Sequence, residues 1–339
     1  QQPNHFFNKS IPDSRLDEAC AVARKNGMAM EFEFDERATI AAPDTFYDRM
    51  LAYIDRFEKN DVFNASAVAY YCGNRGVLTL FESNEHKDKV IMDRLARIIY
   101  TRQVMKYGLP VKNKTRVVAH RGFWHTDGSA ENSVSSLLNA YGAEFDVWMA
   151  ADGKLVIRHD DKHGSYEMEK NPSTVLTTLE LANGEKIPTL EQYLQAARKT
   201  KLELVLEVKP HATPEADAEA VRKIVEMIGK YGLTKRVTYI SFSFHALKEL
   251  VRVAPAKTPI MYLGGGTLPE DLKKMGMTGC DFNYWVFQNN PTWLHSIKWL
   301  KMASNVWTVN NPVEMLWVIE NGFDFITTDR PDLFLRLVR

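Results

Sequence analysis

From residue 115 to the C-terminus, short apolar runs alternate with longer amphipathic runs over about 225 residues. The apolar runs predict β-strands, and the runs with helical periodicity predict α-helices. The expected strands are 117–120, 143–149, 154–159, 202–208, 236–242, 259–263, 279–284, 305–309 and 323–327. The expected helices are 133–141, 189–199, 213–230, 244–253, 268–275, 291–303 and 312–320. This alternation predicts an α/β fold with a parallel sheet, and its length favours a TIM-type (β/α)8 barrel.

An open, doubly wound sheet is the alternative architecture for such a pattern. That fold commonly carries a glycine-rich turn after a strand, where the backbone holds a phosphate group. Gly264-Gly265-Gly266 follows an expected strand but lacks the G-x-G-x-x-G spacing of such a turn. We therefore interpret these glycines as a flexible loop and favour the barrel.

Nine expected strands exceed the eight places of a barrel, and the run 154–159 is the one we expect outside it. Its connection to the preceding strand is too short for a parallel crossover, which needs about a dozen residues. We therefore expect it to run antiparallel to 144–149, with a two-residue loop at 152–153. That register would place His159 directly opposite Asp146.

The segment before the barrel predicts a smaller, separate α/β module over residues 1–110, ending at the Gly- and Pro-containing stretch 108–114. Its acidic strand, with Glu31, Glu33 and Asp35, fits either a carboxylate face or the polar side of a half-exposed strand. The string GMAMEFEFDERA resembles the end of a domain of unknown function from larger secreted proteins of gut bacteria. This resemblance carries no activity, so the module is either an accessory layer or a partial barrel.

Composition excludes several classes of protein. Lys plus Arg and Asp plus Glu both total 43, so no overall charge favours nucleic acid or an anionic membrane. The apolar runs are far shorter than a membrane span. Three widely spaced cysteines, Cys20, Cys72 and Cys280, form neither a disulfide framework nor a zinc motif, and we expect buried thiols. Without an initiator Met the localisation stays open, with secretion or the periplasm slightly favoured, and the oligomeric state is unassigned.

Three acids could meet at one point of the predicted barrel. Glu144 and Asp146 share one face of their strand, because side chains alternate along a strand. Glu207 lies in the next predicted barrel strand. Three carboxylates without a cysteine suit a hard divalent cation, Ca²⁺ or Mg²⁺. The alternative is that each acid pairs with a nearby Lys or Arg.

Two histidines and two cations lie next to these acids. His120 ends the first strand and His159 ends the hairpin, so the pair could act as general acid and general base. Arg121 and Lys209 could neutralise an anionic oxygen, and the planar guanidinium suits a phosphate group. The alternatives are structural hydrogen bonds for the histidines and salt bridges for the two cations.

Nine short motifs occur in order from 115 to 339, and together they closely resemble the glycerophosphodiester phosphodiesterase family. They are His120-Arg121-Gly122, Glu131-Asn132-Ser133, Glu144-Phe145-Asp146-Val147, the Asp152-Gly153 turn before His159-Asp160, Ile187-Pro188-Thr189-Leu190, Glu207-Val208-Lys209, Ser241-Phe242, Trp307-Thr308-Val309-Asn310 and Thr328-Asp329-Arg330-Pro331. Each motif alone is weak, but nine with matching gaps are specific. Two departures are Ser133, where the family usually has Thr, and the absence of an evident inserted cap domain in 161–188.

The resemblance implies a TIM barrel with its site at the carboxyl ends of the strands, hydrolysing small glycerophosphodiesters to glycerol 3-phosphate and an alcohol. The resemblance implies that Glu144, Asp146 and Glu207 hold one divalent cation, Ca²⁺ or Mg²⁺, and that His120 and His159 are the acid/base pair. It implies that Arg121 and Lys209 bind the phosphate group and that Glu131 and Asn132 border the metal and the phosphate. Trp307 would line the alcohol pocket. Without a cap, closure of the pocket would depend on Phe123, Trp124, Tyr284, Trp285 or the N-terminal module.

Two other functions are compatible with the same residues. A lipid phosphodiesterase of the sphingomyelinase D kind would share the histidines and acids but attack membrane lipids. A binding protein would recognise a phosphodiester-decorated polymer without cleaving it. The intact acid/base pair argues against the binder, because binding alone needs no proton transfer.

Overall fold

The computed structural model describes residues 103–110, 112–125, 128–140 and 142–339, together with the isolated positions 18, 21, 22, 25, 26, 97, 100 and 101. The chain divides into two compact units, Gln1–Tyr107 and Gly108–Arg339. The expected strand at 28–34, its three acids, Cys20 and Cys72 lie outside the described residues. Cys280 is buried, as expected.

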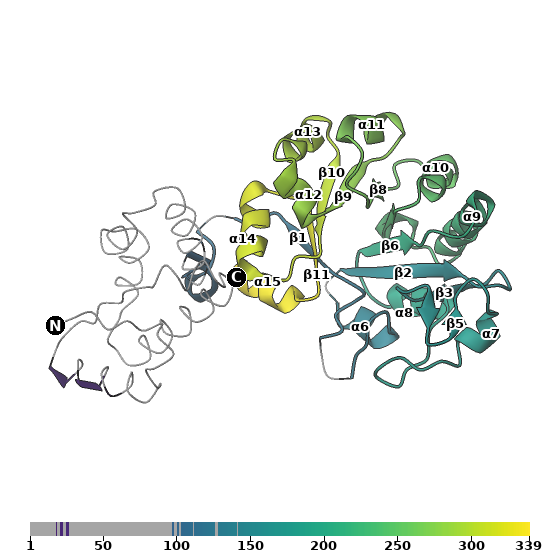
Figure 1. The fold of residues 1–339 in the computed structure, drawn as a ribbon, viewed down its shortest axis with the longest axis horizontal. Helices are drawn as coiled ribbons and strands as arrows, with labels where there is room; N and C mark the ends of the chain where they lie inside the picture. The colour runs from purple at the N-terminus through teal and green to yellow at the C-terminus, as the bar shows by residue number, and fades with distance from the viewer. Residues whose placement is uncertain are drawn as a thin grey trace. The chain divides into compact units, whose positions relative to one another are not determined.

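The second unit is a closed barrel of eight parallel strands, which confirms the predicted fold (Figure 1). The strands follow one another around the barrel in the order β1 (Arg116–Ala119), β11 (Phe325–Thr328), β10 (Ala303–Trp307), β9 (Gly279–Asn283), β8 (Ile260–Tyr262), β7 (Val237–Ser241), β6 (Leu204–Val208) and β2 (Ala143–Met149). A pairing of β1 with β2 closes the ring. Alternate residues of these strands point inward, and the interior is packed by an apolar cluster that includes Val205, Ile240 and Phe325.

Helices surround the barrel on the outside (Figure 1). They are α6 (Val134–Leu138), α7 (Ser173–Leu176), α8 (Leu190–Arg198), α9 (Pro214–Lys230), α10 (Phe244–Val253), α11 (Pro269–Lys274), α12 (Tyr284–Asn289), α13 (Trp293–Trp299), α14 (Pro312–Asn321) and α15 (Pro331–Leu337). The seven predicted helices are all present. The sequence interpretation missed α7, α12 and α15, which are short and directly follow a strand or loop.

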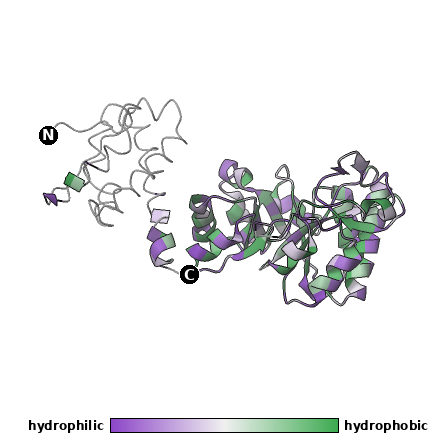
Figure 2. Cartoon of the chain, turned by 90° about the horizontal axis from the view of Figure 1, so that it is seen from below, coloured by the Kyte–Doolittle hydropathy of each residue, from purple (hydrophilic) through white to green (hydrophobic). Residues whose placement is uncertain are grey.

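Local signals explain where these helices begin and end. The Thr189 hydroxyl accepts a hydrogen bond from the backbone of Gln192, whose side chain returns to Thr189, so α8 starts with a capping box. Gly322 ends α14 in the left-handed conformation that glycine adopts without strain. Figure 2 shows hydrophilic and hydrophobic residues together on the barrel helices, as expected for elements with one packed face and one solvated face.

The predicted hairpin exists, but its register was wrong by one residue. Strand β3 (Leu155–Ile157) runs antiparallel to β2, with Val147 opposite Ile157. The loop has three residues rather than two, because Gly153 adopts φ 73° and its N–H donates to the carbonyl of Ala150. Arg158, and not His159, is therefore the residue opposite Asp146, and its N–H donates to the Asp146 carbonyl over 3.1 Å.

The segment 161–188 holds a two-stranded hairpin, β4 (Lys162–His163) with β5 (Tyr166–Glu167), and helix α7. Its apolar residues Met168, Leu176 and Ile187 pack with Trp148 and Val156 of the β2–β3 pair. The segment therefore packs against the β2–β3 hairpin and forms no separate cap domain. Among the residues that the structure describes, no helix is long and apolar enough to span a membrane.

Candidate active site

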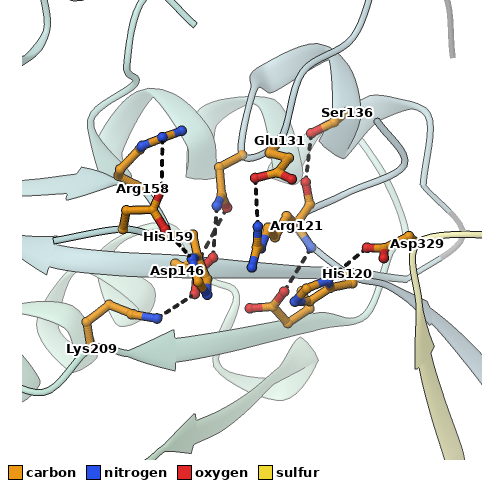
Figure 3. Close-up of polar contacts among 12 residues, drawn as sticks. His120, Arg121, Glu131, Ser136, Asp146, Arg158, His159, Lys209 and Asp329 are labelled. Carbon is orange, nitrogen blue, oxygen red and sulfur yellow. Dashed lines mark hydrogen bonds and ion pairs between the residues drawn. The ribbon is translucent and has the colours of Figure 1, made fainter. Parts of the chain in front are cut away.

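A cavity of about 260 Å³ opens at the carboxyl ends of the barrel strands. Six of the candidate site residues from the sequence line it: His120, Arg121, Glu144, His159, Glu207 and Trp307. Glu144 and Glu207 belong to β2 and β6, and Trp307 ends β10. His120 and Arg121 follow β1 and His159 follows β3 (Figure 3), so segments far apart in the sequence meet here. A TIM barrel carries its functional residues at this end.

The chain leaving β1 is held in a conformation that brings Arg121 to the cavity. Arg121 and Gly122 both adopt positive φ, 57° and 76°. The Arg121 N–H donates to Glu144 Oε2 over 2.8 Å, and its guanidinium contacts Glu131 Oε2 at 2.7 Å. The left-handed backbone at these two residues therefore lets Arg121 contact two acids. Its backbone N–H binds Glu144 of β2, and its side chain binds Glu131.

We expect Gly122→Ala to lower the free energy of unfolding by about 2 kcal/mol or more, because left-handed backbone alone costs an L-residue about 1–2 kcal/mol. A Cβ at this position would also lie 2.7 Å from the backbone carbonyl carbon of Ser136. Gly184→Ala is the matched control, since Gly184 has φ 83° but open space around it. Urea unfolding should show a clearly larger loss for Gly122→Ala, and equal losses would contradict the close packing.

The three acids predicted on β2 and β6 meet as expected. Glu144, Asp146 and Glu207 are buried, and one oxygen of each lies within 4.8 Å of the others. Among the described residues Glu144 Oε1 has no hydrogen-bond partner. Burial, together with the charges of Asp146 and Glu207, raises the pKa of Glu144 well above its usual range. Burial, with the charge of Asp146, raises the pKa of Glu207 to about 8.

One lysine contacts two of these acids. Lys209 Nζ lies 3.2 Å from Asp146 Oδ1 and 2.9 Å from Glu207 Oε1. Although burial opposes ionisation, the Lys209 charge lowers the pKa of Asp146 to about 2. Asn132, in a left-handed conformation, donates to Asp146 Oδ2 over 2.8 Å. Among the described side chains, Lys209 is the single ion-pair partner of the three acids. One positive charge therefore neutralises only part of the negative charge that three carboxylates can carry.

Each of the two histidines is held by a carboxylate. His120 Nδ1 lies 2.8 Å from Asp329 (Figure 3), and His159 Nδ1 lies 2.8 Å from Asp160. An Nδ1–H that donates to a carboxylate leaves Nε2 as the acceptor. The ring centroids are 6.5 Å apart. Burial lowers the pKa of His159, which favours its neutral form.

Trp307 lies in the wall of the cavity, together with Phe242 from the end of β7. Their rings meet edge to face with centroids 5.8 Å apart. The Trp307 indole N–H donates to the backbone carbonyl of Asp281 on β9 over 2.9 Å. The aromatic residues that we expected to close the pocket, Phe123, Trp124, Tyr284 and Trp285, are not among the described residues that line it.

Several residues of the site were missed in the sequence. Asp329 follows β11 and is held from its other oxygen by Asn310 at 2.7 Å. Asp160 follows His159 directly. Both lie in motifs quoted above, but nothing in the sequence gave them a partner. Asp281 is an acid inside a buried strand, and that pattern is the sequence signal that could have identified it.

Fold and site together define a TIM-barrel hydrolase of phosphoric diesters. The chain belongs to the glycerophosphoryl diester phosphodiesterase family, whose model matches residues 120–333. Residues 1–97 match a second model, that of a domain of unknown function, DUF4855, in agreement with the resemblance seen in that segment.

Known proteins resemble the barrel over nearly their whole length. A crystal structure of a glycerophosphodiester phosphodiesterase from Parabacteroides distasonis is 45% identical with a TM-score of 0.65, covering 67% of this chain and 98% of that one. A glycerophosphodiester phosphodiesterase from Caldanaerobacter subterraneus is 27% identical over 67% of this chain and 98% of its own. A phosphodiesterase from Oleispira antarctica, solved with sn-glycerol-3-phosphate, shares the fold at 24% identity, with a TM-score of 0.59, over 66% of this chain and 96% of its own.

Proposed function

We propose that this chain hydrolyses glycerophosphodiesters to glycerol 3-phosphate and an alcohol, with one divalent cation, Ca²⁺ or Mg²⁺, held by Glu144, Asp146 and Glu207. Family membership supports the reaction class. The observation that carries the mechanism is the arrangement around one cavity. Three buried acids with one lysine partner face two histidines, each oriented by its own carboxylate.

The residues present fit a hard cation. All the candidate ligand atoms are carboxylate oxygens within 4.8 Å of one another, and Glu144 Oε1 has no other partner among the described residues. The raised pKa values of Glu144 and Glu207, caused by burial and by the neighbouring carboxylates, indicate that the cluster lacks positive charge. A bound cation would supply that charge and offset the negative charge of the phosphate oxygens.

Arg121 and Lys209 would bind the phosphate group. Both side chains are largely buried, at 19% and 10% exposure, so their charges act with little screening by water. The Arg121 Nε has no partner among the described residues, which leaves one N–H of its fork for an anionic oxygen. Glu131 holds the guanidinium, and Asn132 holds Asp146, so both would position groups that contact the substrate.

His120 and His159 would divide the proton transfers between them. One neutral ring takes the proton of the attacking hydroxyl at Nε2, and the other, protonated, returns a proton to the departing alkoxide. The attacking oxygen is that of water, or first the glycerol 2-hydroxyl to give a cyclic phosphate that water then opens. Both routes need the same pair of rings, one on each side of the phosphorus atom.

We expect Asp329→Asn to lower kcat by about 10- to 100-fold, since misplacing a reacting group by about 1 Å costs on that order. The amide would either leave His120 in the wrong tautomer or release the ring. Asp332→Asn is a suitable control, because Asp332 lies three residues away and pairs with Arg330 outside the cavity. Steady-state kinetics with KM and kcat separated should show the loss in kcat, and unchanged kinetics would remove Asp329 from the mechanism.

A diester panel with product identification tests the proposed function. The full chain would be incubated with soluble glycerophosphodiesters and, separately, with sphingomyelin and lysophospholipid vesicles, in the presence of Ca²⁺ or Mg²⁺. We expect glycerol 3-phosphate from the soluble diesters. Turnover confined to the vesicles would favour the lipid phosphodiesterase, and binding of diesters without release of any product would favour the non-catalytic binder.

A further inference from the structure

A fourth acid lies in the same cavity, on the opposite wall. Asp281 belongs to β9, which is four strands from β2 in either direction around the barrel. It lines the cavity, and it is only 1% exposed, as is Asp146. Among the described residues its Oδ1 has no hydrogen-bond partner. The mechanism proposed above does not use this carboxyl group.

A buried carboxyl without a partner is unfavourable in its ionised form. Burial raises the pKa of Asp281 to about 7, and the Asn305 side chain opposes this shift only in part. Near neutral pH the carboxyl group is therefore divided between its two forms. A positively charged group placed against it would favour the carboxylate and satisfy the free oxygen.

The side chains around Asp281 suit an organic cation. Trp307 is fixed beside it by the hydrogen bond from the indole N–H to the Asp281 carbonyl. Phe242 stands edge to face with Trp307, and Ile240 and Leu263 complete an apolar wall. Aromatic rings attract an ammonium group through their faces, and more strongly where water is excluded. The cations of the site are paired elsewhere: Arg121 contacts Glu131, and Lys209 contacts the acids of β2 and β6.

We propose that Asp281 is a specificity-determining residue that binds the protonated amine of the departing alcohol, with Phe242 and Trp307 beside it. The preferred substrates are then glycerophosphodiesters of short amino alcohols such as ethanolamine. The glycerol half is uncharged and needs no carboxylate, so the charge complementarity assigns this wall to the alcohol. This inference rests on the proposed function and names the substrate class of that site.

A matched pair of diesters tests it. Glycerophosphoethanolamine and glycerophosphopropanol differ by an ammonium in place of a methyl group. Charge-assisted hydrogen bonds are worth about 1.5–3 kcal/mol, so the wild-type chain should prefer the amine by about 10- to 100-fold in kcat/KM. Asp281→Asn should remove most of this preference, because the loss in kcat/KM falls mainly on the ethanolamine diester. Phe242→Leu should reduce the preference by a few fold, because Phe242 is 43% exposed and cation–π energies at exposed sites are about 0.5–1 kcal/mol.

Glu203→Gln is the control, an acid-to-amide change at an exposed residue directly before β6, and it should change kcat/KM for neither diester. The inference is overturned if the wild-type chain treats the two diesters alike, or if Asp281→Asn lowers both equally. Should Asp281→Asn fail to fold, the wild-type ratio and Phe242→Leu still decide. Release of glycerol 3-phosphate from both diesters at equal kcat/KM would contradict this inference alone. No release from either diester would contradict the proposed function as well.

Discussion

Replacing His120 by alanine is expected to lower kcat by about 10²- to 10⁴-fold, the usual contribution of a positioned acid or base. The fold should remain intact, because the ring is partly exposed and its side-chain hydrogen bond is to Asp329 at the carboxyl end of the barrel. His159→Ala should give a loss of the same order. His159 reaches the cavity from the turn after β3, so its removal leaves the barrel strands untouched.

The measurement is release of glycerol 3-phosphate at saturating substrate, with circular dichroism and the thermal midpoint as checks of the fold. His295→Ala is the matched control, an exposed histidine on α13, away from the cavity. If both rings act as proposed, the double variant should lose little more than either single variant, because one proton transfer without the other gives no turnover. A near wild-type rate in either single variant would remove that histidine from the mechanism.

The second large effect concerns the acids. Glu144→Gln should weaken cation binding by about 100-fold or more, since even residues that only support a metal ligand contribute about 10- to 100-fold. The metal-free protein should nevertheless become more stable. The pKa of Glu144 is raised in the folded chain, chiefly by burial, so this residue lowers the stability of the metal-free fold at every pH above its ordinary pKa of 4.5, where the unfolded chain loses the proton more readily. The neutral amide removes that penalty.

Thermal unfolding with and without cation separates these two effects. The wild-type chain should have the lower midpoint when stripped of metal and should gain stability when Ca²⁺ or Mg²⁺ is added. Glu144→Gln should start higher and gain little. Glu185→Gln is a control with the same chemical change at an acid that contacts Ser135 and Asn183 outside the cluster. A cation-induced shift of wild-type size in Glu144→Gln would contradict its role as a ligand.

The architecture could be predicted because it depends on periodicity. Each barrel strand reads as a short apolar run and each long helix as an amphipathic one, and both signals lie within a few residues of sequence. The antiparallel place of β3 also followed from sequence, because its connection to β2 is too short for a parallel crossover. Its register did not, since one glycine in a left-handed conformation turns a two-residue loop into a three-residue loop.

The site was predicted in its residue types and only partly in its contacts. The acids of β2 and β6 could be brought together because alternation fixes which face of a strand each side chain occupies. Reasoning from the register alone put His159 opposite Asp146. In the structure it reaches the cavity from beyond the end of β3, where strand geometry no longer applies. The hydrogen bonds of Asp329 and Asp160 depend on loop conformations that no periodic pattern encodes.

The position of Asp281 in the cavity could not be predicted from the sequence either. Its strand reads as an apolar run interrupted by one acid, and the sequence alone does not say whether that acid faces the barrel interior or a helix. Only closure of the barrel places β9 across from β2 and gives the acid a position in the cavity.

Removal and return of the cation tests the central claim most directly. The full chain, stripped with EDTA and freed of chelator, would be titrated with Ca²⁺ or Mg²⁺ while glycerol 3-phosphate release and bound metal are both measured. We expect no turnover in the stripped protein, full recovery at one bound cation per chain, and no recovery in Glu207→Gln. Turnover that persists without a cation, or recovery in Glu207→Gln equal to that of the wild type, would contradict the proposed site.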